Sequence, residues 1–297
     1  MREILFATDF SERSDRALRR AILIAKATGA RLTLLHVVDD DRPRRIVDGE
    51  RDTAEQLLHE QAQTLATVDG IASRAQIMIA SPAVGLAKAS ENSAYDLLIV
   101  GQHRRQLIRD AFVGTTVERT LRQVRTPVLV VSGPPVGAYH HILVTTDLSD
   151  SSRSAADKFA RLGLGGGAQT TLLHVFIAPA LRLTMGHTTS EDVRKDILYD
   201  ERKNALARLS AFARSLGLNR PQIAVRHEDT TTANEILAAA AESGSELIVV
   251  ASQSKGRFEK FLLGSVTENV LAESSVDVLV IPPVPADENN EDVLTDT

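Results

Sequence analysis

The sequence predicts an α/β protein of two tandem Rossmann-like domains, each a five-stranded parallel sheet with helices on both faces. Short apolar runs alternate with segments of helical periodicity, and runs such as LLIV at 97–100 are apolar throughout, as in strands covered on both faces. The pentapeptide TLLHV occurs at 33–37 and again at 171–175. A Pro- and Gly-rich stretch, SGPPVGA at 132–138, continues neither a helix nor a strand and separates the two occurrences.

The first copy contains five expected strands, each short and apolar, at residues 4–7, 32–38, 75–80, 97–100 and 128–131. The first helix is expected to begin at Ser11 or Ser14, because an apolar stripe follows at helical spacing: Ala17, Leu18, Ala21, Ile22 and Ala25. A polar connection over 39–52 leads into a helix with one apolar face, formed by Ala54, Leu57, Leu58 and Leu65. Further helices are expected at 83–93 and 114–124.

The same order of elements returns in the second half of the chain. Residues 4–9 (ILFATD) match residues 142–147 (ILVTTD) at a displacement of 138, whereas Gly114 and Glu118 match Gly264 and Glu268 at a displacement of 150. Two copies of one unit explain both displacements if the second carries 12 extra residues in its middle, around a longer helix at 190–216. The expected organisation is a first domain at 1–132, a linker at 133–140, a second domain at 141–284 and an acidic, disordered tail at 285–297.

One glycine-rich stretch imitates a dinucleotide fingerprint. Gly163, Gly165 and Ala168 have the spacing G-x-G-x-x-A. That fingerprint requires a strand before the glycines and a helix after them, whereas here a helix pattern precedes them and a strand pattern follows. The glycines are therefore expected to end a helix, with Gly167 matching the capping Gly29 of the first copy.

The composition narrows the class of protein. The 297-residue chain is 43% apolar and 25% charged, carries a net charge of −5, and has no cysteine and no tryptophan. Absent cysteines exclude disulfides and thiolate metal sites and favour a cytoplasmic location. The acidic balance and few aromatic residues argue against nucleic-acid binding. We expect no membrane span and no signal peptide, because no apolar run is long enough to cross a bilayer and the first residues lead directly into a strand.

Ligands of an open parallel sheet bind beyond the carboxyl ends of its strands, where the strand order reverses. The expected first strands end at Asp9 and Asp147, and the second strands end at Val37 and Val175. After the fourth strands come Gly101 and Ala251, each followed by a loop and then by a glycine–hydroxyl pair that opens a helix: Gly114-Thr115 and Gly264-Ser265. A glycine at a helix start lets a phosphate approach exposed N–H groups.

These residues resemble the motif G-x2-G-x9-G-[S/T], which the nucleotide-binding members of the universal stress protein family carry after strand four. In the first copy the motif reads Gly101, Gln102, His103, Arg104, nine residues, Gly114, Thr115. In the second it reads Ala251, Ser252, Gln253, Ser254, nine residues, Gly264, Ser265. The spacing agrees in both copies, and with the I-L-x-x-x-D and V-L-V segments the chain is identified as a tandem member of that family.

The resemblance implies a stress regulator that binds ATP or a related adenine nucleotide, with or without Mg²⁺. Asp9 and Asp147 would lie near the ribose, Val37 and Val175 would offer backbone groups to the adenine, and the glycine–hydroxyl pairs would hold the phosphates. The nucleotide contacts expected are Asp9, Val37, Gly101, His103, Arg104, Gly114, Thr115 and Thr116 in the first copy, and Asp147, Val175, Ala251, Gln253, Ser254, Gly264, Ser265 and Val266 in the second.

The resemblance also implies assembly. The last strands, at 128–131 and 278–281, would pair across the two domains, as in the dimers of single-domain relatives, and the whole chain would form a homodimer.

Both motifs depart from the family pattern. Arg104 replaces the second glycine of the first motif, and Ala251 and Ser254 replace two glycines of the second. If those glycines need positive φ, each replacement costs about 1–2 kcal/mol. Basic residues in both loops, such as Arg105 and Lys255, favour a polyphosphate. The second site is the closer match.

Other interpretations stay open. The aspartates are equally suited to capping the following helices. For the glycine–hydroxyl pairs, an ordinary helix start is the alternative to phosphate contact and the less favoured of the two. His36 and His174 recur at matching positions, where a local hydrogen bond is expected rather than catalysis or metal binding. A nucleotide-free scaffold with degenerate sites is the main alternative function. A slow ATPase would depend on Asp9 or Asp147, and no catalytic or metal-binding set is expected.

Overall fold

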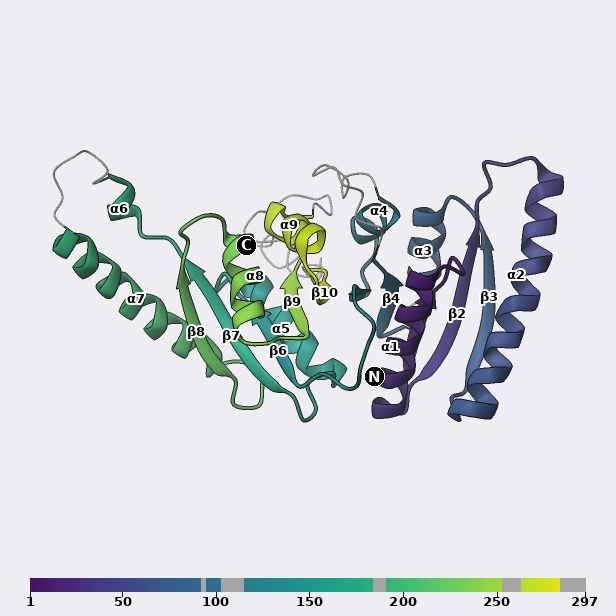
Figure 1. Ribbon diagram of the computed structural model, residues 1–297, viewed down its shortest axis with the longest axis horizontal. Coiled ribbons are helices and arrows are strands. Elements are labelled where there is room, and N and C mark those ends of the chain that lie inside the picture. Colours follow the sequence, from purple (N-terminus) through teal and green to yellow (C-terminus); the bar gives the residue numbers. More distant parts are fainter. Residues whose placement is uncertain (92–94, 103–114, 184–190, 253–262, 284–297) are drawn as a thin grey trace, which may run out of the picture.

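The structure is a computed structural model that describes residues 1–91, 95–102, 115–183, 191–252 and 263–283. Figure 1 shows the two halves of the chain side by side, with helices α2 and α7 at opposite ends of the molecule. We call β1 to β5 with their helices the first module, and β6 to β10 with theirs the second module. The expected tail at 285–297 and the residues His103, Arg104, Gly114, Gln253 and Ser254 lie outside the described residues.

Each module contributes five strands to one sheet. The strands in the centre of each module are apolar and mostly buried, whereas the outermost strand of each module contains polar residues and is only partly covered. The strands are β1 (Glu3–Ala7), β2 (Arg31–Val38), β3 (Ser73–Ile79), β4 (Leu97–Gly101), β5 (Val128–Val131), β6 (His141–Thr145), β7 (Gln169–Phe176), β8 (Gln222–His227), β9 (Leu247–Ala251) and β10 (Asp277–Ile281).

Helices connect the strands. The first module contains α1 (Glu12–Thr28), α2 (Arg44–Thr64), the π-helical turn η1 (Leu65–Asp69), α3 (Pro82–Glu91) and α4 (Thr116–Leu121). The second contains α5 (Asp150–Leu162), α6 (Pro179–Leu183), α7 (Glu191–Ala213), α8 (Thr232–Glu242) and α9 (Ser265–Glu273). No helix among the described residues is long and apolar enough to cross a membrane.

The ten strands form one sheet in the order β3-β2-β1-β4-β5-β10-β9-β6-β7-β8. Neighbours within each module are parallel, whereas β5 and β10 pair antiparallel with Leu129 opposite Leu279. The expected pairing of the last strands is confirmed, and it merges the two predicted sheets. Within each module the order reverses at the pair β1 and β4, or β6 and β9, which are the two places where ligands of such sheets bind.

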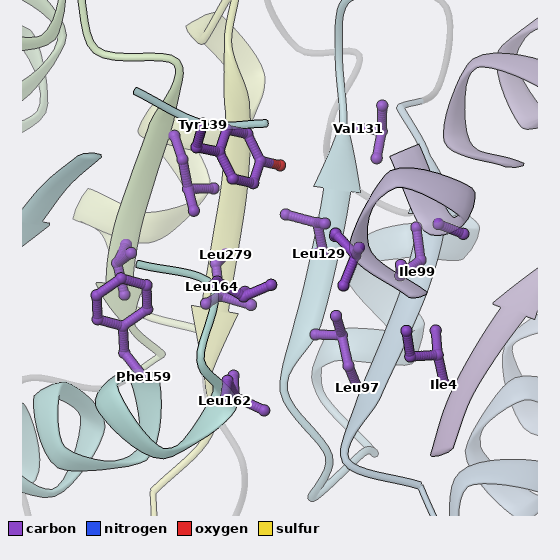
Figure 2. Close-up of a cluster of buried hydrophobic side chains, with 14 of the residues drawn as sticks. Ile4, Leu97, Ile99, Leu129, Val131, Tyr139, Phe159, Leu162, Leu164 and Leu279 are labelled. Carbon is purple, nitrogen blue, oxygen red and sulfur yellow. The ribbon is translucent and has the colours of Figure 1, made fainter. Parts of the chain in front are cut away.

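Two apolar layers cover the sheet. One contains buried residues of α1, α2, α5 and α7, and the other contains those of α3, α4, α8 and α9. Figure 2 shows the first layer at the seam between the modules, where Leu129 of β5 and Leu279 of β10 approach each other. Because both layers continue across the seam, the modules share their core.

The seam also contains one buried ion pair. Arg20 of α1 donates from Nε to Oδ2 of Asp277 on β10 at 2.9 Å, and both side chains are buried. The Tyr139 hydroxyl donates to the same oxygen at 2.7 Å, and the Ser132 N–H donates to Oδ1 at 3.0 Å. Burial and the nearby Asp277 carboxylate hold the pKa of Tyr139 well above its ordinary value. The cluster therefore ties α1, the connecting segment and β10 together.

Two expectations need correction. Helix α2 begins at Arg44, inside the stretch expected to be a polar connection, because Val47 lies on the same buried face as Ala54 and Leu58. Helix α5 is capped by Gly163, with φ 75°, and ends before Gly167, so Gly29 and Gly163 are the capping glycines of the two copies. The glycine-rich stretch does end a helix, as expected, and strand β7 follows it.

Candidate functional site

A cavity of about 440 Å³ lies at the carboxyl ends of the second module's strands. Its lining includes five of the residues expected to contact a nucleotide: Asp147, Val175, Ala251, Gly264 and Val266. They come from the turn after β6, from β7 and β9, and from the start of α9, so residues far apart in the sequence meet at the place where the strand order reverses. Ligand pockets have volumes of about 300–1,000 Å³, and this cavity falls within that range.

The first module has a smaller cavity at the matching place. Its volume is about 290 Å³, and it is lined by four expected residues: Asp9, Val37, Gly101 and Thr116. Thr115 and Ser265 are adjacent in sequence to lining residues but do not line the cavities themselves. The two cavities have a common plan, because each collects the ends of the first, second and fourth strands of its module.

The turn after the first strand has the same geometry in both modules. Phe10 has φ 58° and Leu148 has φ 65°, a left-handed conformation that is uncommon for residues other than glycine. The N–H groups of Phe10 and Leu148 donate to the hydroxyls of Thr8 and Thr146, at 3.0 and 2.9 Å. A strained turn that recurs in both copies beside a cavity is a feature often found at functional sites.

The aspartates hold the caps rather than forming them. The N-caps of α1 and α5 are Ser11 and Ser149. The Ser11 N–H donates to Asp9 Oδ1 at 3.1 Å, and the Ser149 N–H donates to Asp147 Oδ1 at 3.0 Å. In both modules the serine hydroxyl donates to the same oxygen at 2.5 Å. Each carboxylate is thereby oriented at the cavity by the start of the next helix.

Asp9 remains ionised at neutral pH. Burial by itself raises the pKa of its carboxyl group, but hydrogen bonds from Ser11 and Ser14 and the charge of Arg13 outweigh that effect and lower the pKa below its ordinary value. Arg13 Nη2 lies 3.6 Å from Asp9 Oδ2 in a largely exposed pair. An ionised carboxylate accepts hydrogen bonds, so Asp9 is suited to binding hydroxyl groups of a ligand.

The two strand-end histidines make the local hydrogen bonds expected of them. His36 Nδ1 lies 2.8 Å from the Thr8 carbonyl, and His174 Nδ1 lies 2.9 Å from the Thr146 carbonyl. A carbonyl only accepts, so Nδ1 carries the hydrogen in both. Among the described residues no three His, Asp or Glu side chains are grouped so that they could hold a metal ion.

Gly101 is required by packing rather than by backbone conformation. Its φ is not positive, but a Cβ atom there would lie 2.8 Å from the Arg13 carbonyl oxygen. The matching residue of the second module, Ala251, carries such an atom, so α5 leaves room that α1 does not. The cost of positive φ considered from the sequence therefore does not apply at these two positions.

The helix starts at the cavities differ. In the first module the Thr115 hydroxyl is the N-cap of α4 and accepts from the Glu118 N–H at 3.1 Å. In the second module the N-cap of α9 is Gly264, which offers no side-chain cap. The first N–H groups of α9 are therefore left without that internal acceptor, beside the larger cavity. This contrast favours the second module as the place for an anion.

The comparison with known proteins agrees with the repeated architecture. The sequence model of the Universal stress protein family matches residues 1–132 and again residues 138–282. The chain belongs to the universal stress protein family. It is a tandem member, and in both of its modules a cavity lies at the matching strand ends.

This universal stress protein resembles relatives along its whole length and relatives that match about half of it. A universal stress protein of Mycolicibacterium smegmatis is 26% identical over 300 residues, which cover 94% of this chain and 97% of the relative. One from Methanocaldococcus jannaschii is 28% identical over 144 residues, covering 48% of this chain and 82% of the relative. The crystal structure of an Archaeoglobus fulgidus universal stress protein has a TM-score of 0.68 at 22% identity and covers 95% of this chain and 97% of its own. That likeness supports the shared fold.

The sequence motifs of this universal stress protein did not predict three polar residues that line its second cavity. Glu201, Asn204 and Arg208 of α7 line it together with Ala205. Their spacing along α7 places all of them on one helical face. No family motif includes them, and only a position-by-position comparison of α7 with α2 would have drawn attention to them.

Proposed function

We propose that the protein binds ATP or a related adenine nucleotide in these cavities, and that the bound nucleotide controls its contacts with other proteins during stress. The observation that carries the proposal is the second cavity, where Asp147, Val175, Ala251 and Gly264 converge at the reversal of strand order. The ribose would lie at Asp147, the adenine at the backbone of Val175, and the phosphates at the start of α9 near Gly264, Ser265 and Val266.

The first cavity would be the weaker site. It is smaller, and the Thr115 hydroxyl already accepts from an N–H of α4. Asp9, Val37, Gly101 and Thr116 would contact the nucleotide there in the roles of their second-module counterparts. The protein would work as a cytoplasmic binding protein and homodimer rather than as an enzyme, with Mg²⁺ accompanying the ligand when it carries a polyphosphate.

The first test is direct. Freshly purified protein is denatured, any released nucleotide is identified by mass spectrometry, and ligand-free protein is titrated calorimetrically with magnesium-ATP. Released adenine nucleotide, or saturable binding of about one or two per chain, supports the proposal. If no nucleotide is released and millimolar ATP gives no binding heat, the binding free energy is weaker than about 4 kcal/mol. That result overturns the proposal and favours the nucleotide-free scaffold.

The substitution Gly264→Val tests where the ligand lies. A Cβ atom at this position lies 3.5 Å from the Ser252 carbonyl oxygen, an ordinary contact, so the fold tolerates the change while the side chain enters the space next to α9. ATP affinity should fall at least about tenfold, a loss of roughly 1.4 kcal/mol. Gly133→Val, where a Cβ atom is 3.9 Å from Ser275, is the control outside both cavities. Equal ATP affinity in both variants and the parent would contradict the placement.

A further inference from the structure

The second cavity reaches a part of its module that the first cavity does not. Asp147 and Ser152 of the second cavity lie on the side of the sheet covered by α5 and α7, whereas Ile236 and Gly264 lie toward α8 and α9. The cavity therefore extends over the carboxyl ends of the strands, from one side of the sheet to the other, and includes a face of α7. In the first module the corresponding face of α2 lines a separate cavity of about 540 Å³.

Helices α2 and α7 can be matched residue by residue. Ala54 and Leu58 are buried on α2, and Ala205 and Leu209 are buried on α7 with the same spacing. This register places Glu201 opposite Glu50 and Asn204 opposite Thr53, and each of these four residues lines the cavity next to its helix. It also places Arg208 where the first module has Leu57. The second module thus has a guanidinium where the first has an apolar side chain.

One residue pair separates the two cavities of the first module. His36 lines both of them, and the Phe10 ring lies against the His36 ring with 4.7 Å between their centroids. In the second module Leu148 takes the place of Phe10, in the same left-handed conformation, and His174 takes the place of His36. Leu148 has no ring to lie against the histidine, and the cavity is continuous from α9 to α7.

The polar groups on the α7 face are available to a ligand. Within the described residues, the side chains of Arg208, Asn204 and Glu201 make no hydrogen bond or ion pair with the protein, in contrast to the side chain of Glu50, which pairs with Arg42. Glu201 stands seven residues from Arg208, two turns or roughly 10 Å along the helix axis, so its charge does not cancel that of the guanidinium locally. The Asp147 carboxylate is held by Ser149 and Ser152, whose hydroxyls donate to Oδ1.

We propose that Arg208, with Asn204 beside it, forms an anion subsite that binds a phosphate group on the ribose of the nucleotide in the second cavity. The inference rests on the proposed function, which places the ribose at Asp147. Asp147 and Arg208 line the same cavity, and α5 and α7 cover the same side of the sheet, so a substituent on a ribose hydroxyl extends toward α7. A guanidinium matches the geometry of a phosphate, and an amide side chain adds a donor. The preferred ligand class is therefore an adenine nucleotide phosphorylated on its ribose.

Calorimetric titration of the full chain with AMP, adenosine 2′,5′-bisphosphate and adenosine 3′,5′-bisphosphate tests the subsite. The parent protein should bind one of the bisphosphates about tenfold more tightly than AMP, at one site per chain. Which bisphosphate is preferred identifies the ribose hydroxyl that faces Arg208. Arg208→Leu, which introduces the residue of the first module, should abolish the preference. Lys203→Ala, an exposed charge on α7 outside the cavity, should retain it.

A second variant tests access to the subsite while the charge of Arg208 is retained. Leu148→Phe gives the second module the residue that Phe10 supplies in the first, at a position with the same backbone conformation. Its ring should lie against His174, separate α7 from the rest of the cavity and abolish the preference although Arg208 is intact. Equal binding of AMP and both bisphosphates by the parent, or a preference that survives Arg208→Leu, overturns the subsite alone. If neither AMP nor ATP binds the parent, the proposed function fails as well.

Discussion

The two modules share the turn that presents their aspartates but differ in the helices that surround it. In both, a threonine, an aspartate and a serine after the first strand make the same hydrogen bonds, and the intervening residue has positive φ. Among the described residues, only those of the second module join that turn to a continuous cavity of about 440 Å³ that reaches α7. The difference teaches that strand ends fix the position of a site, whereas the adjacent helices set its size and charge.

The seam between the modules departs from the repeat in a second way. Arg20 of α1 and Asp277 of β10 form a buried pair, but their counterparts by the repeat are Lys158 and Pro127, which cannot form one. Lys158 is only partly covered: its ammonium reaches the Arg125 carbonyl at 3.4 Å in a solvent-exposed contact, and the partial burial, together with the charge of Arg161, lowers the pKa of Lys158 below its ordinary value. The antiparallel pairing of β5 and β10 is symmetric, whereas the charges on its two sides are not.

The largest effect on stability is expected from a substitution that removes the buried ion pair from its side of the seam. Asp277→Ala takes the Oδ2 acceptor from the buried Arg20 and Tyr139 side chains and the Oδ1 acceptor from the partly buried Ser132 N–H. Removing one partner of a buried ion pair costs about 3–5 kcal/mol, so the free energy of unfolding should fall by that amount. Urea denaturation followed by circular dichroism measures it.

Lys158→Ala is the matched control on the other side of the seam. An exposed contact contributes less than about 1 kcal/mol, so this variant should unfold close to the parent's midpoint. Similar losses in both variants would mean that the buried cluster adds nothing beyond the symmetric pairing of β5 and β10.

Gly101→Ala should have the next largest effect. Its Cβ atom would lie 2.8 Å from the Arg13 carbonyl oxygen and 2.9 Å from the carbonyl carbon, and backbone atoms cannot rotate away. Such overpacking costs about 1–3 kcal/mol, measured as a loss of unfolding free energy in urea. The reciprocal change in the second module, Ala251→Gly, should cost at most about 1 kcal/mol, the entropic effect of a glycine in a strand. A larger loss for Ala251→Gly than for Gly101→Ala would contradict the packing argument.

The fold was largely predictable from the sequence, because its elements follow local rules. Strands β4 and β9 are apolar on both faces, and Ser11 and Ser149 occupy cap positions in front of amphipathic stripes. The start of α2 was missed because its first turns contain many charged residues, and only contact with the sheet reveals that Val47 is buried. The seam pairing came from family resemblance, since periodicity does not specify which sheet edges meet.

The candidate site was predictable in part. Strand-end positions such as Asp147 and Val175 follow from the parallel sheet, and the structure brings them to one cavity. Arg208 was not predictable in this way, because a charged residue on a long helix resembles any solvated surface residue until the packing of α7 is known. The contribution of His103, Arg104, Gly114, Gln253 and Ser254 stays a prediction, because they lie outside the described residues.

Tyr139→Phe tests the buried cluster at the seam through the pH dependence of the free energy of unfolding. At pH 8 the variant loses one hydrogen bond to Asp277, about 1.5 kcal/mol. Burial and Asp277 raise the pKa of Tyr139, so above the ordinary value of about 10 the unfolded chain releases the phenolic proton while the folded protein retains it. The parent should therefore lose stability between pH 10 and 11 more steeply than the variant. Parallel stability profiles in that range, measured by urea denaturation, would contradict the assigned role of Tyr139.

The smallest effect concerns the two helix starts. Thr115→Ala removes the hydroxyl that accepts from the Glu118 N–H, and the loss of such a cap costs about 1 kcal/mol of unfolding free energy. Gly264→Ser adds a hydroxyl at the cap position of α9, where none exists and a Cβ atom has room, and should stabilise the ligand-free protein by a few tenths of a kcal/mol. The same serine would compete with a phosphate for the N–H groups of α9, so ATP affinity should fall as stability rises. If both quantities rise together in calorimetry, the start of α9 does not hold the phosphates.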